Sequence, residues 1–388
     1  MKIVQKKFSK SKGWETLRND NFKDSDCNLV IVFGSKDLLK DSSIYNGIRN
    51  DYPAAEIIMN TTSGEIMDVQ VSDETISLTA IKFDKAKLKT GSVNIASHPN
   101  SYEAGRALAK QFFKPDNMKN ILVISDGQLV NGSELVSGLQ SILDKDIIIT
   151  GGLAGDGANF KSTLVGLNNT PTEGMIIAVA FYGSIVVTHG SVGGWDSFGP
   201  ERIITKSKAN VLYELDGKPA LDIYKKYLGD QAKDLPGSGL LFPLSIRAKD
   251  SDDALVRTIL NISEADKSMT FAGNMPEGFY ARLMKANFDR LIEGSSNAAQ
   301  NSMESGMENL RNPSGIQPPE LAILISCVGR KLVLDQRIEE EVEVVRAVYG
   351  DKTAITGFYS YGEIAPSFNF SKCELHNQTM TITTFSEE

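Results

Sequence analysis

One pattern occurs three times along the chain and limits its fold more than any other feature. Each copy predicts a buried strand, a helix, and a second strand that runs into a loop. The first strands are expected at Leu29–Phe33, Ile121–Ser125 and Leu321–Ser326, the helices at about Asp37–Asn50, Ser133–Leu143 and Glu339–Val348, and the second strands at Glu56–Met59, Ile147–Thr150 and Ala354–Thr356. Parallel strands need a helical crossover between them, so the pattern predicts three βαβ-like units.

The three loops that end these units share a glycine beside an acidic residue. Glycine lets a backbone approach a ligand closely, and the carboxyl ends of parallel strands are where open α/β sheets bind ligands. The expected ligand-binding residues of these loops are Gly64, Glu65, Gly155, Asp156, Tyr361, Gly362 and Glu363. The same acids could instead cap turns or helix starts, which is a structural role.

Two residues outside the loops are further candidates for ligand binding. Arg330 follows the first strand of the third unit. Its planar guanidinium group matches the geometry of a carboxylate. Trp195 lies in a glycine-rich segment and could close over a pocket as a flap, or lie buried in a domain seam.

The segments between the units look rich in strands. Thr75–Phe83 alternates apolar and polar residues, Met175–Thr188 predicts a hairpin, and Leu375–Phe385 predicts a closing strand. Gly278–Leu310 predicts one long helix or two, followed by a linker over Asn312–Pro319. Together these segments predict an α/β fold with mixed sheets, repeated βαβ-like units and inserted β-hairpins.

Length and spacing together predict two domains. A chain of 388 residues is too long for one ordinary core, and a border is expected near Gly217. The expected division is an N-terminal extension over 1–26, an N-terminal domain over 27–217 and a C-terminal domain over 218–388.

Composition disfavours several classes of partner. The net charge of −8 repels nucleic acid and anionic lipid. No stretch approaches the ~18 apolar residues of a membrane span, and the lysine-rich start lacks the apolar run of a signal peptide. The cysteines Cys27, Cys327 and Cys373 have no CxxC spacing, so neither a disulfide framework nor a zinc site is expected. A soluble cytoplasmic protein is the expectation.

Catalytic motifs are missing from the sequence. The glycine-rich run at 151–157 follows a strand, but no helix opens after it as a dinucleotide site requires. There is no P-loop and no GxSxG elbow, and the histidines His98, His189 and His376 lack metal-protease spacing. We therefore expect a binding protein, with a hydrolase-like enzyme with an unrecognised site as the alternative.

From about Cys27 to Phe385 the sequence resembles the FIST family of sensory domains. The resemblance is carried by the segments Val211–Leu221, Ser326–Arg330, Arg337–Glu341, Gly357–Pro366 and Leu375–Thr379, with a shorter match at Thr62–Ile66. It implies a FIST N-terminal domain followed by a FIST C-terminal domain. It also implies that the protein senses a small ligand such as an amino acid. The signal would pass to a separate partner, such as a histidine kinase or a cyclic-di-GMP enzyme.

The resemblance also implies an alternative ligand. Stand-alone proteins of similar architecture include haem-binding nitric-oxide sensors that control a histidine kinase. Haem needs an axial ligand, for which His189 or His376 are the candidates because both lie in family-like segments. A cysteine ligand is also open.

Overall fold

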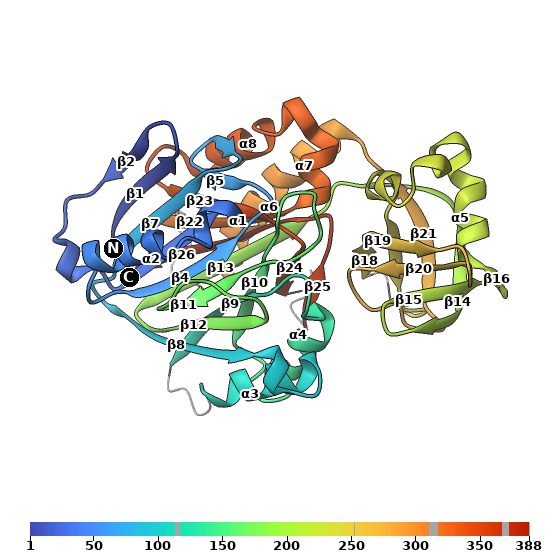
Figure 1. Cartoon of the computed structure of the whole chain (residues 1–388), viewed down its shortest axis with the longest axis horizontal. Coiled ribbons are helices and arrows are strands. Elements are labelled where there is room, and N and C mark those ends of the chain that lie inside the picture. The colour runs from blue at the N-terminus through green and yellow to red at the C-terminus, as the bar shows by residue number, and fades with distance from the viewer. Residues whose placement is uncertain (113–116, 252, 310–316, 367–371, 388) are drawn as a thin grey trace.

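The chain folds into a core and an insert that lies to one side of it (Figure 1). The computed structural model describes residues 1–112, 117–251, 253–309, 317–366 and 372–387. The core combines residues from both ends of the chain, and the insert spans 196–285. The predicted α/β fold with mixed sheets and two domains is confirmed.

The core contains three six-stranded sheets, each built around one of the predicted units. In each unit the first and second strands pair in parallel, and a third strand pairs antiparallel with the first. These strands are β3 (Leu29–Gly34), β4 (Glu56–Thr61) and β7 (Ile76–Lys82) in unit 1; β9 (Met118–Ser125), β10 (Ile148–Leu153) and β12 (Met175–Gly183) in unit 2; and β22 (Leu321–Cys327), β23 (Ala354–Ser360) and β26 (Met380–Glu387) in unit 3. The predicted βαβ units are therefore confirmed.

Helices join the parallel strands, as the crossover rule requires. They are α1 (Lys36–Leu39) and α2 (Ser42–Asp51) in unit 1, α4 (Gly132–Gln140) in unit 2, and α7 (Val328–Leu334) and α8 (Glu340–Tyr349) in unit 3. The helix predicted at about Asp37–Asn50 is thus two helices. Asp41 separates them and caps α2 by accepting a hydrogen bond from the Ser43 amide.

After its second strand, each unit sends a strand into the sheet of another unit. β5 (Glu65–Met67) of unit 1 pairs with β23, β24 (Gly362–Pro366) of unit 3 pairs with β10, and β11 (Val165–Leu167) of unit 2 pairs with β4. The exchange is cyclic, from unit 1 to unit 3, from unit 3 to unit 2, and from unit 2 to unit 1. It brings the three glycine–acid loops to one place.

The remaining core strands extend the sheet edges. They are β1 (Lys2–Ser9) and β2 (Gly13–Asn19) in sheet 1, β8 (Ala86–Asn94) and β25 (Cys373–His376) in sheet 2, and β6 (Gln70–Ser72) and β13 (Ile185–Val192) in sheet 3. The residues expected as an N-terminal extension thus form a hairpin that continues sheet 1.

Side chains from all three sheets fill one central apolar core. Phe33 of sheet 1 packs on Phe358 of sheet 3 with ring centroids 4.8 Å apart, and Phe181 of sheet 2 packs on Phe385 of sheet 3 at the same separation. Fully burying one such ring stabilises the fold by about 1.5–3 kcal/mol.

The hairpin predicted over Met175–Thr188 is wrong. β12 pairs with β8 and β9 in sheet 2, whereas β13 pairs with β26 in sheet 3. Gly183, with φ of +88°, turns the chain between them. Apolar residues of both strands, including Phe181 and Ile185, enter the central core. The burial of apolar residues of both strands in the central core therefore outweighs the pairing of β12 with β13 as a hairpin.

Two other segments also depart from their predictions. The start of Gly278–Leu310 is a strand, β21 (Tyr280–Lys285), and only the rest is helical as α6 (Phe288–Asn309). The closing strand expected over Leu375–Phe385 is interrupted between β25 and β26. Much of the linker expected over Asn312–Pro319 lies outside the described residues.

Among its described residues, the insert contains an eight-stranded antiparallel sheet with one packed α-helix. Its strands are β14 (Asp196–Lys208), β15 (Val211–Leu215), β16 (Lys218–Pro219), β17 (Leu244–Arg247), β18 (Ala254–Arg257), β19 (Ile259–Ser263), β20 (Ser268–Phe271) and β21, and its helix is α5 (Ala220–Leu228). Gly217, the expected border, lies in the turn between β15 and β16. The chain passes between core and insert twice, before β14 and after β21.

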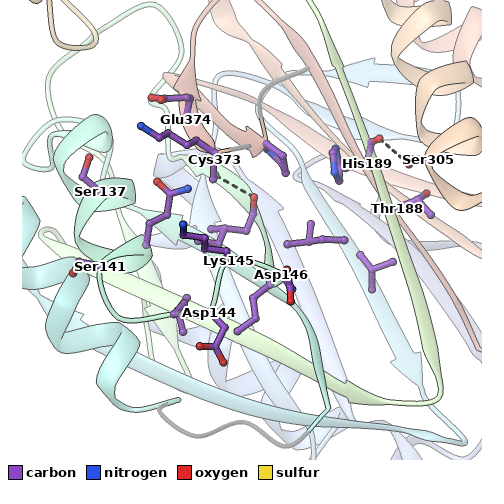
Figure 2. Close-up of a pocket in the computed structure, with 18 residues that line it drawn as sticks. Ser137, Ser141, Asp144, Lys145, Asp146, Thr188, His189, Ser305, Cys373 and Glu374 are labelled. Atoms are coloured by element: carbon purple, nitrogen blue, oxygen red, sulfur yellow. Dashed lines mark hydrogen bonds between the residues drawn. The ribbon is translucent and has the colours of Figure 1, made fainter. Parts of the chain in front are cut away.

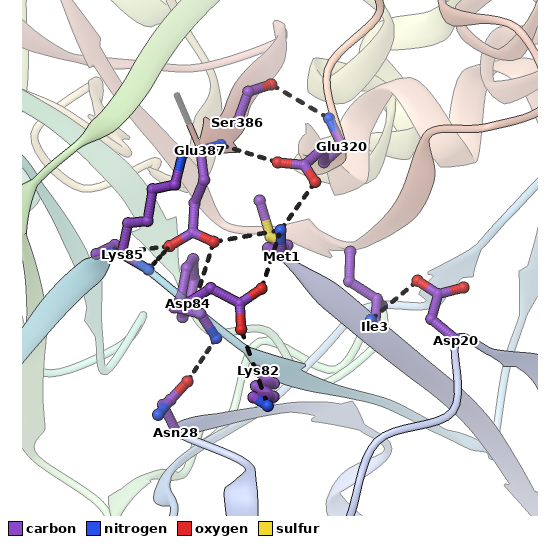
Figure 3. A network of polar contacts seen from close by, with 12 residues as sticks. Met1, Ile3, Asp20, Asn28, Lys82, Asp84, Lys85, Glu320, Ser386 and Glu387 are labelled. Carbon is purple, nitrogen blue, oxygen red and sulfur yellow. Dashed lines mark hydrogen bonds and ion pairs between the residues drawn. The ribbon is translucent and has the colours of Figure 1, made fainter.

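The first and last strands of the core meet at a polar cluster (Figure 3). The amino group of Met1 lies 2.9 Å from Glu320 and 3.2 Å from Glu387. Glu387 also accepts the backbone N–H groups of Asp84, Lys85 and Ala86. These contacts tie β1 to β26. Among the described residues, no helix is long and apolar enough to cross a membrane.

Candidate functional site

The three glycine–acid loops meet at one junction, where they bond to one another. Ser63 N–H donates to the Tyr359 carbonyl at 2.8 Å, Tyr361 N–H to Leu153 at 3.1 Å, and Gly155 N–H to Thr61 at 3.0 Å. In each loop, the residue that donates one bond lies two positions after the residue whose carbonyl oxygen accepts a bond from another loop. The three bonds therefore link the three loops in a closed ring. The ring gives the core an approximate threefold symmetry, and the loops therefore converge.

Glu65 and Glu363 occupy equivalent places in this ring and make equivalent bonds. Thr62 Oγ1 donates to Glu65 at 2.5 Å, and the N–H and hydroxyl of Thr75 donate to its other oxygen at 3.2 and 2.7 Å. For Glu363 the donors are the Ser360 hydroxyl at 2.6 Å and the N–H and hydroxyl of Thr379 at 3.2 and 2.9 Å. Each carboxyl group thus fastens the loop to the start of the third strand of its unit.

Burial changes the protonation of these two acids. It raises the pKa of Glu65 to about 7 and the pKa of Glu363 to about 8, although the hydrogen bonds oppose the shift. Their interactions within the protein are those that a capping role requires. Their predicted contact with a ligand stays a prediction.

Unit 2 fixes its loop with residues other than a glutamate. Gly157 stands where the other loops have glutamate, and Asp156, one residue earlier, accepts the N–H groups of Lys161 and Ser162 at 3.1 and 3.0 Å. Asp156 also accepts the hydroxyl of Tyr361, whose ring stacks on Phe160. The aspartate therefore orders its own loop.

Arg330 lies in a buried polar network on α7. Its guanidinium donates to Glu341 at 2.8 Å, to the Leu291 carbonyl at 2.7 Å, to Ser295 at 2.8 Å and to the Gly193 carbonyl. Both charged side chains are fully buried. The network joins α7, α6 and α8 to the connection that leads into the insert, and binding of a ligand carboxylate by Arg330 stays a prediction.

Trp195 lies at the same connection, and its side chain is 8% exposed. Its indole N–H donates to the Gln378 carbonyl at 2.8 Å, and its ring packs with Leu291 and Met284. In this structure the tryptophan fills the seam between core and insert.

A cavity of about 810 Å³ lies at the other end of sheet 2, beside the C-terminal end of α4 (Figure 2). Five of its 18 lining residues are charged, namely Asp144, Lys145, Asp146, Lys372 and Glu374. Within the described residues none of these five makes an ion pair. The remaining lining includes apolar Ile148 and Ile149 of β10, together with Val187, Thr188 and His189 of β13. None of the residues predicted to bind a ligand lines this cavity, whereas the candidate metal ligand His189 does.

The two candidate haem ligands differ in position. His189 on β13 lines the cavity, and burial lowers its pKa to about 4. His376 on β25 does not line it, and burial lowers its pKa to about 4 as well, while its Nε2 lies 3.1 Å from the Ala365 carbonyl oxygen. Both imidazoles are therefore neutral at physiological pH, which is the form that binds a metal. No cluster of three metal-binding side chains occurs in the part of the chain that the structure describes.

The residues of the cavity fit haem in their donor chemistry. His189 would hold the iron through a neutral imidazole nitrogen, and Lys145 and Lys372 would supply cations for the two propionates. When bound, haem would provide an iron atom that takes up a diatomic gas.

The sequence does not predict several residues of these sites. Thr75 and Thr379 complete the glutamate contacts from positions ten and sixteen residues further along. Lys145 and Glu374 reach one cavity from different units. Such residues carry no local pattern. A Ser/Thr three residues before each glutamate was the one local sign of the contact.

Comparison with known protein families matches residues 28–218 to the FIST N domain and residues 220–366 to the FIST C domain. The chain belongs to the FIST family. FIST domains are sensory domains that bind small ligands. The two FIST segments meet within the insert, so both contribute to its sheet. No match was found among curated proteins.

Proposed function

We propose that this FIST protein is a cytoplasmic sensor that binds a free amino acid or a similar zwitterion without turning it over. The observation that carries the proposal is the cavity beside α4. It combines cationic Lys145 and Lys372 with anionic Asp144, Asp146 and Glu374. A zwitterion presents one charge of each sign, and these charged groups, which form no ion pair within the described residues, could pair with both.

The cavity also lies where a bound ligand would affect more than one element. Its walls come from α4, β10, β13 and β25, which belong to two sheets and to units 2 and 3. A ligand that bridges these walls would change their relative position, and a separate partner could detect that change. A histidine kinase or a cyclic-di-GMP enzyme is the partner that family membership supports.

Thermal unfolding with each of the twenty amino acids at millimolar concentration tests the proposal. A ligand at 100 times its dissociation constant stabilises the protein by about 2.7 kcal/mol, which is a clear rise in Tm. Lys145→Met and Glu374→Gln should each weaken the responding amino acid at least tenfold. Lys10→Met, in the exposed turn after β1, is the matched control and should bind normally. The absence of a response to every amino acid would refute this ligand class.

Haem is the second candidate, and the observation that favours it is the neutral His189 imidazole on the cavity wall. After incubation with haem, the protein should show a Soret band that shifts when nitric oxide is added. His189→Ala should remove the band, and His376→Ala should keep it. A band that survives in His189→Ala would exclude this residue as the axial ligand.

A further inference from the structure

Asn377 and Gln378 lie between β25 and β26, and their side-chain amides are buried without hydrogen-bond partners. Both residues are 0% exposed, and all four polar atoms of the two amides are unpaired. The other buried amides with an unpaired atom, Asn60 and Asn120, each keep a bond through Nδ2. Native structures rarely leave buried polar groups unpaired, so this pair requires an explanation.

The backbone adopts an unfavourable conformation at one of these residues. Gln378 has φ of +65°, in the left-handed region, where glycine or asparagine is the usual residue. A Cβ atom at Gly329, in the first turn of α7, would collide with the Gln378 amide. The chain therefore keeps a strained glutamine, and a glycine beneath it, around an amide that bonds to nothing in the protein.

A buried cation contacts the segment that carries the two amides. Arg257 of β18 is 3% exposed, and its guanidinium donates to the carbonyl oxygens of Leu375 at 2.8 Å and Asn274 at 3.2 Å. Leu375 stands two residues before Asn377. Unlike Arg330, which pairs with Glu341, Arg257 has no carboxylate within 4.0 Å among the described residues. The Glu374 carboxylate attracts this guanidinium from beyond ion-pair distance, and a buried cation with no carboxylate in contact favours an anion beside it.

These groups come from both sides of the seam between core and insert. Arg257 belongs to the insert, and Asn377 and Gln378 belong to the core. Trp195, at the connection into the insert, donates its indole N–H to the Gln378 carbonyl. Gly194, with φ of +84°, lies in the same connection. Ligand sites often lie at such domain interfaces.

We propose that Asn377, Gln378 and Arg257 bind a small carboxylate that carries an amino or hydroxyl group on the adjacent carbon. The carboxylate would accept hydrogen bonds from the two amide NH₂ groups and from the guanidinium. An amino group would donate to both amide oxygens, so every unpaired atom would gain a partner, whereas a hydroxyl group would donate to one of them. Because the amides are buried, the insert must move relative to the core when the ligand enters, and the ligand then holds the two units together.

This site is separate from the cavity beside α4, which none of the three residues lines. Glycine could bind at either site, so the variants distinguish the two proposals: loss of binding in Lys145→Met indicates the cavity, and loss in Gln378→Met indicates the seam.

Titration of the full chain with four small probes tests the ligand chemistry. Glycolate and glycine should raise Tm and bind in calorimetry. Acetate, which lacks the neighbouring donor, should bind at least tenfold more weakly, and methylammonium should not bind. Equal binding of acetate and glycolate, or binding of neither glycolate nor glycine, would overturn the proposal.

Two substitutions locate the site. Gln378→Met and Asn377→Leu should weaken glycolate at least tenfold and raise the Tm of the ligand-free protein, because an apolar group of similar size replaces an unpaired amide. Lys10→Met, in the exposed turn after β1, is the control and should leave glycolate binding unchanged, whereas Lys145→Met tests whether the carboxylate binds in the cavity instead. Arg257→Lys keeps the positive charge but loses the planar guanidinium group, so it should weaken glycolate binding. This variant tests the site even if the other variants fold poorly.

The contrary outcomes are equally specific. If glycolate binding is lost in Lys145→Met and kept in Gln378→Met, the carboxylate binds in the cavity. If the amide variants lower Tm and the wild type ignores all four probes, the amides hold only structural water. Either result would overturn the seam site.

Discussion

Glu65 and Glu363 each accept three hydrogen bonds from groups of their own unit, at equivalent places in the loop junction. A carboxyl group can accept these bonds in either protonation state, but burial penalises its charged form. The pKa of each acid is accordingly raised, to about 7 and about 8. The junction therefore depends on pH in the physiological range.

The first prediction concerns the pH dependence of stability. Because both folded-state pKa values exceed the unfolded value of about 4.3, the folded protein binds more protons between that pH and about pH 8. The contribution of these acids to the free energy of unfolding is thus full below about pH 4 and declines as pH rises to about 8. Glu363→Gln, which mimics the protonated acid, should flatten this decline in urea unfolding at pH 5, 6, 7 and 8.

The difference in unfolding free energy between Glu363→Gln and the wild type isolates the contribution of Glu363. His189 and His376 act oppositely, because their lowered pKa values make stability rise with pH between about 4 and 6.5. A Glu363→Gln protein whose stability runs parallel to the wild type across this range would contradict the assigned shift. Retention of fold with loss of ligand binding would restore the binding role first expected of Glu363.

The buried pair Arg330–Glu341 gives the second prediction. Arg330→Met leaves the Glu341 carboxylate buried without its partner, which should destabilise the protein by about 3–5 kcal/mol. Arg337→Met, which removes surface ion pairs with Asp289 and Glu340, is the control and should change stability little. Urea unfolding measures both. Similar stabilities of the two variants would show that the buried network adds nothing.

The sequence alone indicates which residues occupy the junction but not what they do there. A glycine beside an acid at a strand end is typical of both ligand contacts and caps. Only the distant partners, such as Thr379 for Glu363, distinguish these roles. The unpaired amides of Asn377 and Gln378 are equally invisible in sequence, since burial and pairing depend on the whole fold.

At the scale of elements, glycines permit the close packing of helix α3 (Ser101–Lys110) against α4. A Cβ at Gly138 would collide with the Tyr102 carbonyl, and a Cβ at Gly105 would collide with the Leu135 carbonyl. The two backbones therefore approach closely at a reciprocal contact. Helical periodicity predicted α4, but it carries no information about the distance to a neighbour.

The third prediction compares two glycines in helices. Gly138→Ala should destabilise the protein by about 1–3 kcal/mol because the added methyl group has no space. Gly47→Ala, at an exposed position of α2 with nothing within 4 Å, should stabilise it by about 0.5–1 kcal/mol. Thermal unfolding of both variants tests the contrast, and equal effects would contradict the packing geometry.

At the scale of the molecule, the repeat in the sequence predicts the three units correctly but not how they combine. Strand exchange pairs β5 with β23, nearly 300 residues away in the chain, and no local signal specifies such a partner. The hairpin wrongly predicted for β12 and β13 has the same origin. Strands that are adjacent in sequence often pair with each other, but here β12 belongs to sheet 2 and β13 belongs to sheet 3.

The fourth prediction concerns cooperativity. The three units share strands and one central core, so they should unfold together, whereas the insert has its own apolar cluster and two connections to the core. Native-state hydrogen exchange should therefore show β3, β9 and β22 opening with one common free energy, and strands of the insert such as β20 opening at a lower one. Distinct values for β3, β9 and β22 would contradict the shared core.

Cyclic strand exchange also limits how such a chain can arise. A single unit would leave the open edge of its second strand without the strand that another unit supplies, and exposed edges recruit further chains. In this chain three units close the exchange, because each lent strand is received by another unit. The covalent chain thus has the organisation of a closed trimer, and loss of any one unit would leave one second strand without its partner and one lent strand without a receiver.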